Sequence, residues 1–225
     1  MKIDRKAYPV ARRVQKRGQL KKAHYTSAGG AHLMQLESRL EASCAVAMGL
    51  DPRVRSIRSQ PMTFDLATGR TYPSVEALQA AQKLYGLRCV RYTPDFEVDL
   101  GVSKVLVEVK HRELISMKPA ILGYPNILAR YGYRLVIIDD EILEETYIRN
   151  LRLLNLARNV QRPNTEFARL VEFIAAGVSY GDLLAADFDE AIVLASLANG
   201  HITCDVRSAR LNNSTIIVAT GDTTT

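Results

Sequence analysis

Two short segments in the middle of the chain alternate apolar and polar residues, and a four-residue break separates them. Both lie between Arg91 and Arg112, and the break reads Leu-Gly-Val-Ser. A period of two is typical of strands with one buried face, and two such runs joined by a short turn predict a β-hairpin. We expect the rest of the chain to be organised around this hairpin.

Helical and strand-like segments alternate on both sides of the hairpin. Leucines recur at helical spacing over residues 31–50, which predicts a helix there. Ser74 is a good N-cap and Gly86 a good stop, so a second helix is expected between them. The other expected elements are a strand over 54–66 broken at Gln60-Pro61, a helix over 113–130 interrupted at Gly123 and Pro125, a buried central strand over 133–138 and a helix over 141–157. This alternation indicates an α/β domain.

The last part of the chain has a different pattern. Short helices are expected over 165–176, 179–185 and 188–198, the third capped by Asp187, and two short strands follow over 201–206 and 215–218. Three short helices followed by a hairpin predict a winged helix, a small module that binds DNA or proteins. The expected domains are a basic arm over 1–28, an α/β domain over 29–160 and a winged helix over 161–225 with a frayed tail from Thr220.

Positive charge is concentrated at the N-terminus. The chain has a net charge of +6, and its first 25 residues hold nine Lys or Arg against Asp4 alone, so the remainder is near −2. A basic arm on a near-neutral body indicates nucleic acid as a partner, although a solubilising tail has the same composition. The candidate DNA-binding residues are Arg12, Arg13, Lys16, Arg17, Lys21 and Lys22.

Neither a membrane nor an oxidising compartment is indicated. No apolar run approaches the ~18 residues of a membrane span, and the N-terminus has no apolar signal-peptide core. The three cysteines, Cys44, Cys89 and Cys204, are widely spaced and lack the spacing of a zinc site. We expect reduced cysteines in a cytoplasmic protein without a membrane partner.

The hairpin carries candidate chemistry on one face. The period of two places Glu108 and Lys110 side by side, and antiparallel pairing brings Asp95 opposite Glu108. Buried charges are costly unless they are compensated, and Mg²⁺ prefers carboxylate and carbonyl oxygens. Lys110 would then orient or deprotonate a water, or neutralise phosphate charge. Pro-Asp followed by Glu-x-Lys, 13 residues after the aspartate, matches the PD-(D/E)xK nuclease core. The alternative is a solvated hairpin face with a cross-strand ion pair.

A longer series of motifs resembles one family. In order they are Glu37-Ser38-Arg39-Leu40-Glu41, Asp51-Pro52-Arg53-Val54, Gln60-Pro61, Tyr92-Thr93-Pro94-Asp95-Phe96 and Glu108-Val109-Lys110. This series, over most of the chain, resembles the TnsA endonuclease subunit of heteromeric transposases. The resemblance implies a restriction-endonuclease-like fold in a cytoplasmic bacterial protein that cuts the 5′ ends of a transposon. It also implies a TnsB-like integrase, which cuts and joins the 3′ ends, and a TnsC-like AAA+ ATPase as partners.

The resemblance also implies roles for individual residues. Glu41, Asp95, Glu108 and Lys110 are the expected catalytic residues. The three carboxylates, with the backbone carbonyl of Val109, would bind Mg²⁺, for which Mn²⁺ would substitute. Helical spacing alone allows either Glu37 or Glu41 as the helix ligand, and the family register selects Glu41. Gln60 either touches DNA or holds its strand end, and Cys44, Tyr92 and Phe96 are expected in the core.

Two other functions fit the same residues. A stand-alone restriction or repair nuclease would cut DNA robustly when purified, whereas a TnsA-like subunit would show little activity without its partners. A winged-helix adaptor with an inactive nuclease core would bridge DNA and an ATPase. The complete set of Glu41, Asp95, Glu108 and Lys110 argues against an inactive core.

Overall fold

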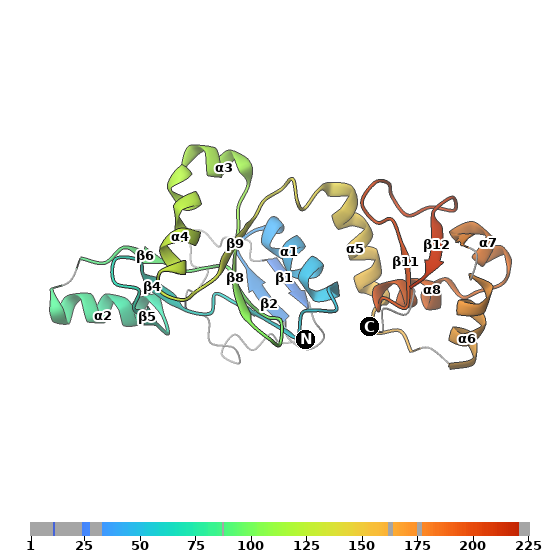
Figure 1. Cartoon of the computed structure of the whole chain (residues 1–225), viewed down its shortest axis with the longest axis horizontal. Coiled ribbons are helices and arrows are strands. Elements are labelled where there is room, and N and C mark those ends of the chain that lie inside the picture. Colours follow the sequence, from blue (N-terminus) through green and yellow to red (C-terminus); the bar gives the residue numbers. More distant parts are fainter. Residues whose placement is uncertain are drawn as a thin grey trace. The chain divides into compact units, whose positions relative to one another are not determined.

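The computed structural model describes residues 11, 24–27, 33–86, 88–161, 164–174 and 177–220 (Figure 1). Their contacts divide the chain into two compact units of mixed α/β structure. The first comprises Met1–Ala45 and Arg53–Ile142, and the second Val46–Pro52 and Leu143–Thr225. No helix within the described ranges is long and apolar enough to cross a membrane.

A four-stranded mixed sheet forms the centre of the first unit. Its strands follow the order β3 (Ser56–Ser59), β7 (Phe96–Asp99), β8 (Lys104–Val109) and β9 (Leu135–Ile138). The first three are antiparallel neighbours, and β8 and β9 are parallel. Phe96 pairs with Val107 and Asp99 with Lys104. The predicted hairpin is therefore confirmed, with the Leu-Gly-Val-Ser turn between its strands.

A helical crossover connects β8 to β9, as parallel neighbours require. It consists of α3 (Arg112–Met117), the 3-10 helix η1 (Pro119–Gly123) and α4 (Tyr124–Ala129). The predicted interruptions are confirmed, since Gly123 ends η1 and Pro125 lies in the first turn of α4. The prediction that 133–138 forms a central buried strand is wrong. Among the described strands β9 is at one end of the sheet, and its last three residues are only half-buried.

A second, three-stranded sheet packs with helix α2 (Val75–Tyr85). Its order is β5 (Thr71–Tyr72), β4 (Thr63–Asp65) and β6 (Arg91–Tyr92). The predicted limits of α2 are confirmed, because Ser74 Oγ accepts a hydrogen bond from Ala77 N and Gly86 ends the helix in a left-handed conformation. One apolar core joins this sheet to the crossover and to the larger sheet, and it contains Phe64, Leu66, Tyr92, Leu106, Leu128 and Leu135.

The start of the first predicted helix is wrong. Residues 33–36 form strand β2 (Leu33–Leu36), which pairs with β1 (His24–Ser27), and helix α1 (Arg39–Leu50) begins only after Ser38. The leucines at these positions fit either element locally, and the pairing with β1 decides between them. The predicted boundary between arm and domain, at residue 28, consequently falls inside a strand pair.

The second unit contains the three predicted short helices and the two predicted strands. Its elements are α5 (Glu145–Ala157), α6 (Asn164–Phe173), β10 (Val178–Ser179), α7 (Tyr180–Ala185), α8 (Glu190–Ala198), β11 (Ile202–Cys204) and β12 (Ile216–Ala219). The strands form an antiparallel sheet in the order β10-β12-β11. Asp189, not Asp187, caps α8, since its carboxylate accepts a hydrogen bond from Ala191 N.

Helix α5 groups with the second unit, whereas the sequence placed it in the α/β domain before residue 160. Its buried Asn150 explains the grouping. Asn150 Nδ2 donates to the carbonyls of Val206 and Ala209, at 2.9 and 2.8 Å, and Oδ1 accepts from Leu211 N. One side chain of α5 thus satisfies three backbone groups of the loop between β11 and β12.

Candidate functional site

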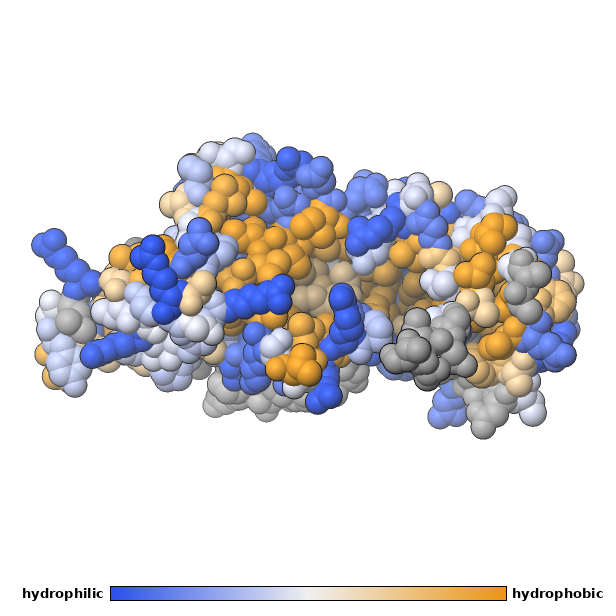
Figure 2. All heavy atoms as spheres, in the orientation of Figure 1, coloured by the Kyte–Doolittle hydropathy of each residue, from blue (hydrophilic) through white to orange (hydrophobic). Residues whose placement is uncertain are grey.

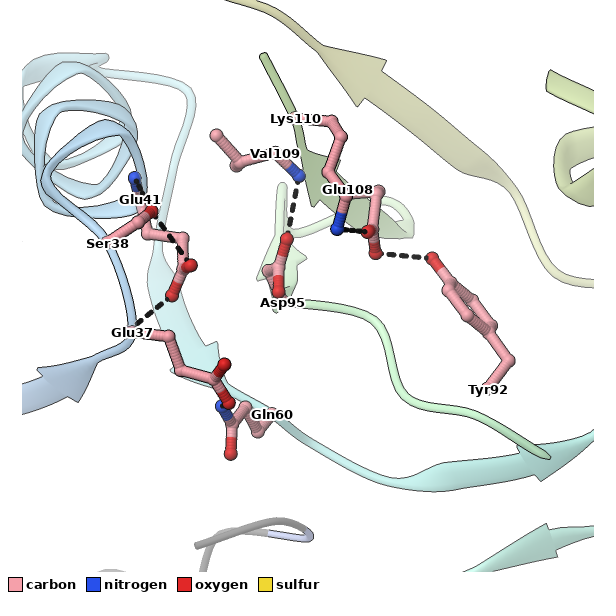
Figure 3. A network of polar contacts seen from close by, with 9 residues as sticks. All are labelled: Glu37, Ser38, Glu41, Gln60, Tyr92, Asp95, Glu108, Val109 and Lys110. Atoms are coloured by element: carbon pink, nitrogen blue, oxygen red, sulfur yellow. Dashed lines mark hydrogen bonds and ion pairs between the residues drawn. The ribbon is translucent and has the colours of Figure 1, made fainter. Parts of the chain in front are cut away.

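Asp95, Glu108 and Lys110 come together where β7 begins and β8 ends (Figure 3). The Asp95 carboxylate accepts a hydrogen bond of 2.8 Å from Val109 N. Lys110 Nζ lies 3.3 Å from Glu108 Oε1. The expectation that the side chains of Glu108 and Lys110 are neighbours is therefore confirmed, with Glu108 on β8 and Lys110 directly after it.

The two carboxylates are buried, unlike other acids on the same hairpin. Asp95 is 6% and Glu108 5% exposed. Glu97, by contrast, forms ion pairs with Arg58 and Lys104, whose side chains are mostly exposed. A cross-strand ion pair with exposed partners describes Glu97 but does not describe Asp95 and Glu108. Burying two acids side by side is costly, so this arrangement needs a further explanation.

Glu41 lies in the first turn of α1, is 7% exposed, and forms a capping box with Ser38. Glu41 N donates to Ser38 Oγ at 3.1 Å, while Ser38 Oγ donates to Glu41 Oε1 at 2.8 Å. Glu37 N donates to the other carboxylate oxygen of Glu41 at 2.8 Å. The Ser-x-Leu-Glu motif therefore has a local role in starting the helix, whatever else Glu41 does.

Glu37 is engaged by a different partner. Gln60 Nε2 donates a 3.2 Å hydrogen bond to Glu37 Oε1. Gln60 also donates its backbone N–H to the carbonyl of Asp95, accepts from Ala11 N, and has a positive φ of 44°. Its buried Oε1 has no hydrogen-bond partner among the described residues. Gln60 thus holds the end of β3 to the segments that carry Glu37 and Asp95.

The acids influence one another electrostatically. Burial raises the pKa of Asp95 well above its usual range, and the charges of Glu108 and Glu41 raise it further. The Val109 N–H and Lys110 offset only part of this rise. Burial, followed by the charges of Asp95 and Glu41, also raises the pKa of the Cys44 thiol to about 12. In Figure 3 the Asp95 carboxylate lies between those of Glu41 and Glu108.

This surplus of negative charge is suited to a hard cation. Carboxylate and carbonyl oxygens are the donors that Mg²⁺ prefers, and Glu41, Asp95, Glu108 and Val109 supply them. Within the described ranges, however, no three His, Cys, Asp or Glu side chains converge as a ready metal-binding group. The donor types fit the ion, and hydrogen bonds to Ser38 and Glu37 hold Glu41 in its present position.

An open pocket of about 580 Å³ lies beside the acids. Asp95, Glu108 and Lys110 line one part of it, and residues of α3, η1 and α4 line another. The pocket opens this group of carboxylates to solvent, although each carboxyl-bearing side chain is itself largely covered by protein.

Sequence reasoning assigned Tyr92 to the core only. Its ring is 7% exposed and belongs to the apolar core, so that prediction is confirmed. Its hydroxyl, however, donates a 2.9 Å hydrogen bond to Glu108 Oε2. No local signal in the sequence reveals this contact. The role of Ser38, in contrast, could have been inferred from the three-residue spacing between Ser38 and Glu41.

The six candidate DNA-binding residues, Arg12, Arg13, Lys16, Arg17, Lys21 and Lys22, lie outside the described residues. No model of a known protein family matches the chain, and no curated protein is significantly similar to it.

Proposed function

We propose that the chain is the Mg²⁺-dependent DNA endonuclease subunit of a TnsA-type transposase, which cuts the 5′ ends of the transposon. The observation that carries this proposal is the buried group of Asp95, Glu108 and Lys110 on one strand pair, with Glu41 close enough to raise the pKa of Asp95. Perturbed titration of this kind, beside an open pocket, is a feature of functional sites.

The surrounding topology supports a PD-(D/E)xK core of the restriction-endonuclease type. A helix, α1, precedes three antiparallel strands, and a helical crossover then leads to the parallel strand β9. Glu108 lies on the middle strand β8, Asp95 directly precedes the middle strand β7, and Glu41 lies at the start of the preceding helix, which supports this motif.

The second unit supports a winged helix. Its elements from α6 onward follow the order helix, strand, helix, helix, strand, strand, and the strands form one antiparallel sheet. In the proposed assembly the basic arm contacts the phosphates of transposon-end DNA. The TnsB-like integrase and the TnsC-like AAA+ ATPase are the protein partners.

Each residue of the site has a distinct task in hydrolysing a phosphodiester. Glu41, Asp95, Glu108 and the Val109 carbonyl would hold Mg²⁺ or Mn²⁺, which supplies charge stabilisation to the phosphate and to the leaving oxygen. Lys110, whose side chain is 38% exposed, reaches the pocket and holds the attacking water or a phosphate oxygen. Tyr92 keeps the Glu108 carboxylate in place.

Transposition assays with the integrase and ATPase of the same element test this function. Asp95→Ala and Lys110→Ala should abolish 5′-strand cutting and shift the product from simple insertions to cointegrates, because the donor stays joined through its uncut strands. Glu97→Ala, which removes a carboxylate of the same hairpin that pairs with exposed cations, is the matched control and should leave simple insertions unchanged. Normal simple insertions by Asp95→Ala would overturn the catalytic assignment. Robust cutting by the purified chain alone would favour a stand-alone nuclease.

A further inference from the structure

The pocket beside the carboxylates has two chemically different sides. Asp95, Glu108 and Lys110 form the polar side. Leu114, Ile121 and Tyr124, which come from the helical crossover, form the apolar and aromatic side, and Leu114 remains 45% exposed. On the face shown in Figure 2, hydrophobic side chains gather over the region between α3 and β9. Hydrolysis of a phosphodiester needs only polar groups. The apolar side therefore indicates that a part of the substrate other than the phosphate enters the pocket.

The volume of the pocket is suited to a nucleotide. About 580 Å³ falls within the range of sites that enclose a small organic molecule, about 300–1,000 Å³. A duplex, whose major groove alone is about 12 Å wide, is too broad to enter such a pocket. A single base is flat and apolar on both faces, and proteins that hold unpaired strands stack such bases on aromatic rings.

Tyr124 supplies a held aromatic ring. It is half-buried, and its ring packs edge to face on Tyr92, with centroids 4.9 Å apart and an interplanar angle of 63°. Tyr92 is fixed in turn by its hydrogen bond to Glu108. Tyr124, whose ring a base would contact, packs on Tyr92, and Tyr92 donates its hydroxyl to Glu108. The base would therefore lie one side chain away from a carboxylate of the proposed catalytic group.

Charge at the mouth of the pocket complements a phosphodiester chain. Arg91 and Lys118 line the pocket and are exposed. Residues 114–138, which include the whole apolar side, carry Lys118, Arg130 and Arg134 and no Asp or Glu. Cations combined with aromatic rings are the usual composition of sites for single-stranded nucleic acid.

We propose that this pocket holds one base that has left the duplex beside the phosphate to be cut, so that the substrate is a duplex opened locally at the cleavage site. The position of the cut rests on the proposed function, whereas binding of the base does not require cutting. Extruding a mismatched or already unpaired base costs less than extruding a paired one, which would favour locally opened DNA over uniform duplex.

The test uses the full-length protein without divalent metal and two duplexes that carry 5-iodouracil. In one the iodouracil lies in a single-stranded overhang, and in the other it is paired within a blunt duplex. Irradiation should crosslink the overhang to the peptide that contains Tyr124, and the blunt duplex should give no such product. Tyr124→Ala should weaken overhang binding by about tenfold, the scale of one lost base stack, and should leave blunt-duplex binding unchanged.

Two further variants keep the result interpretable. Tyr85→Ala removes an exposed tyrosine at the end of α2, outside the pocket, and should change neither affinity. Lys118→Ala alters an exposed residue at the pocket mouth and should also weaken overhang binding, even if Tyr124→Ala fails to fold.

Equal affinity for both duplexes, or crosslinks only outside the pocket, would overturn the proposal. A Tyr124 crosslink without cutting in the complete system would support the pocket and count against the nuclease, and cutting without the crosslink would do the reverse.

Discussion

The hydroxyl of Tyr92 donates a 2.9 Å hydrogen bond to one oxygen of Glu108, and Lys110 Nζ lies 3.3 Å from the other. The two donors come from different sheets, since Tyr92 belongs to β6 and Lys110 follows β8. The Glu108 carboxylate is therefore fixed at both oxygens. Such outer contacts orient a metal-binding carboxylate and set its affinity for the ion.

Tyr92→Phe should weaken metal use without unfolding the chain. The phenylalanine ring retains the packing of Tyr92 against Tyr124 and Phe64 and loses only the hydroxyl. We expect cutting to fall by about 10–100-fold and the Mg²⁺ concentration for half-maximal cutting to rise. Tyr131→Phe is the control, because that hydroxyl donates to the carbonyls of Leu66 and Ala67 in the same unit. An unchanged Mg²⁺ dependence would show that the contact has no positioning role.

Glu41→Gln should damage Mg²⁺-dependent cleavage more than Glu37→Gln. Glutamine still completes a capping box with Ser38, so α1 keeps its start while a proposed metal ligand is lost. Glu37 accepts a hydrogen bond from Gln60. Glu37→Gln therefore alters that contact and leaves the carboxylates around Asp95 in place. Cleavage is measured across a Mg²⁺ titration, with circular dichroism to verify helix content. The opposite ranking of the two variants would move the helix ligand to Glu37.

Asp95→Asn should raise the free energy of unfolding at neutral pH while it abolishes cutting. The folded-state pKa of Asp95 is raised, first by burial and then by Glu108 and Glu41. Its stabilising contribution is therefore complete below the unfolded pKa of about 3.9 and is lost as the pH rises through the folded value. Asparagine is neutral throughout and escapes this loss. For a chain of this size, each kcal/mol gained raises Tm by about 2–4 °C.

Thermal unfolding over a pH series, with and without Mg²⁺, measures this effect. Wild type should gain stability from Mg²⁺ because the ion binds only the folded state, and Asp95→Asn should gain much less. Glu97→Gln is the matched control, since Glu97 lies on the same hairpin and pairs with the exposed cations Arg58 and Lys104. A less stable Asp95→Asn at pH 7 would mean that the carboxylate is compensated by protein groups alone.

Local chemistry allowed the sequence to predict the parts of the fold that depend on neighbouring residues. Ser74 and Gly86 bound α2 because a hydroxyl cap and a left-handed glycine act within one helical turn. The period of two placed Glu108 beside Lys110 for the same reason. These features need no knowledge of distant segments.

The misses depend on contacts between distant segments. The spacing of Leu33 and Leu36 fits a helix, and only the pairing with β1 shows that they belong to a strand. The Tyr92–Glu108 contact joins residues 16 apart on different sheets. Asn150 ties α5 to a loop more than 50 residues later, which is why the predicted domain boundary at 160 differs from the division by contacts. Sequence periodicity carries no information on such pairings.

Asn150→Ala should destabilise the second unit. The side chain is 3% exposed and satisfies the carbonyls of Val206 and Ala209 and the amide of Leu211. Leaving buried backbone groups unpaired costs about 1–3 kcal/mol. Chemical denaturation should report this loss, and hydrogen exchange should locate it in the loop between β11 and β12. Asn212→Ala, an exposed asparagine of the same loop, should cost much less. Equal losses would indicate that the loop is held by other contacts.

The second unit should bind a protein partner in preference to DNA. Residues 165–219 hold three arginines against seven carboxylates, a net charge of −4 that opposes phosphate. The third helix of a DNA-reading winged helix enters the major groove. In the proposed winged helix that position belongs to α8, which is buried at every residue from Ile192 to Ala198 and has α5 and α6 packed against it. Its acidic start is structural, since Asp189 caps the helix and Glu190 accepts a hydrogen bond from Tyr180.

The exposed apolar residues of β12 are the expected contact with that partner. Ile216 and Val218 are 58% and 40% exposed, and their spacing of two places them on one face of the strand. Replacing both with serine in the full-length chain should weaken binding to the AAA+ ATPase of the same element and leave duplex binding unchanged.

Fragment 143–225, which retains α5, should likewise bind the ATPase more tightly than DNA across a salt series. Tight, salt-sensitive duplex binding by this fragment, without affinity for the ATPase, would restore a DNA-reading role, because phosphate contacts give duplex binding a steep salt dependence.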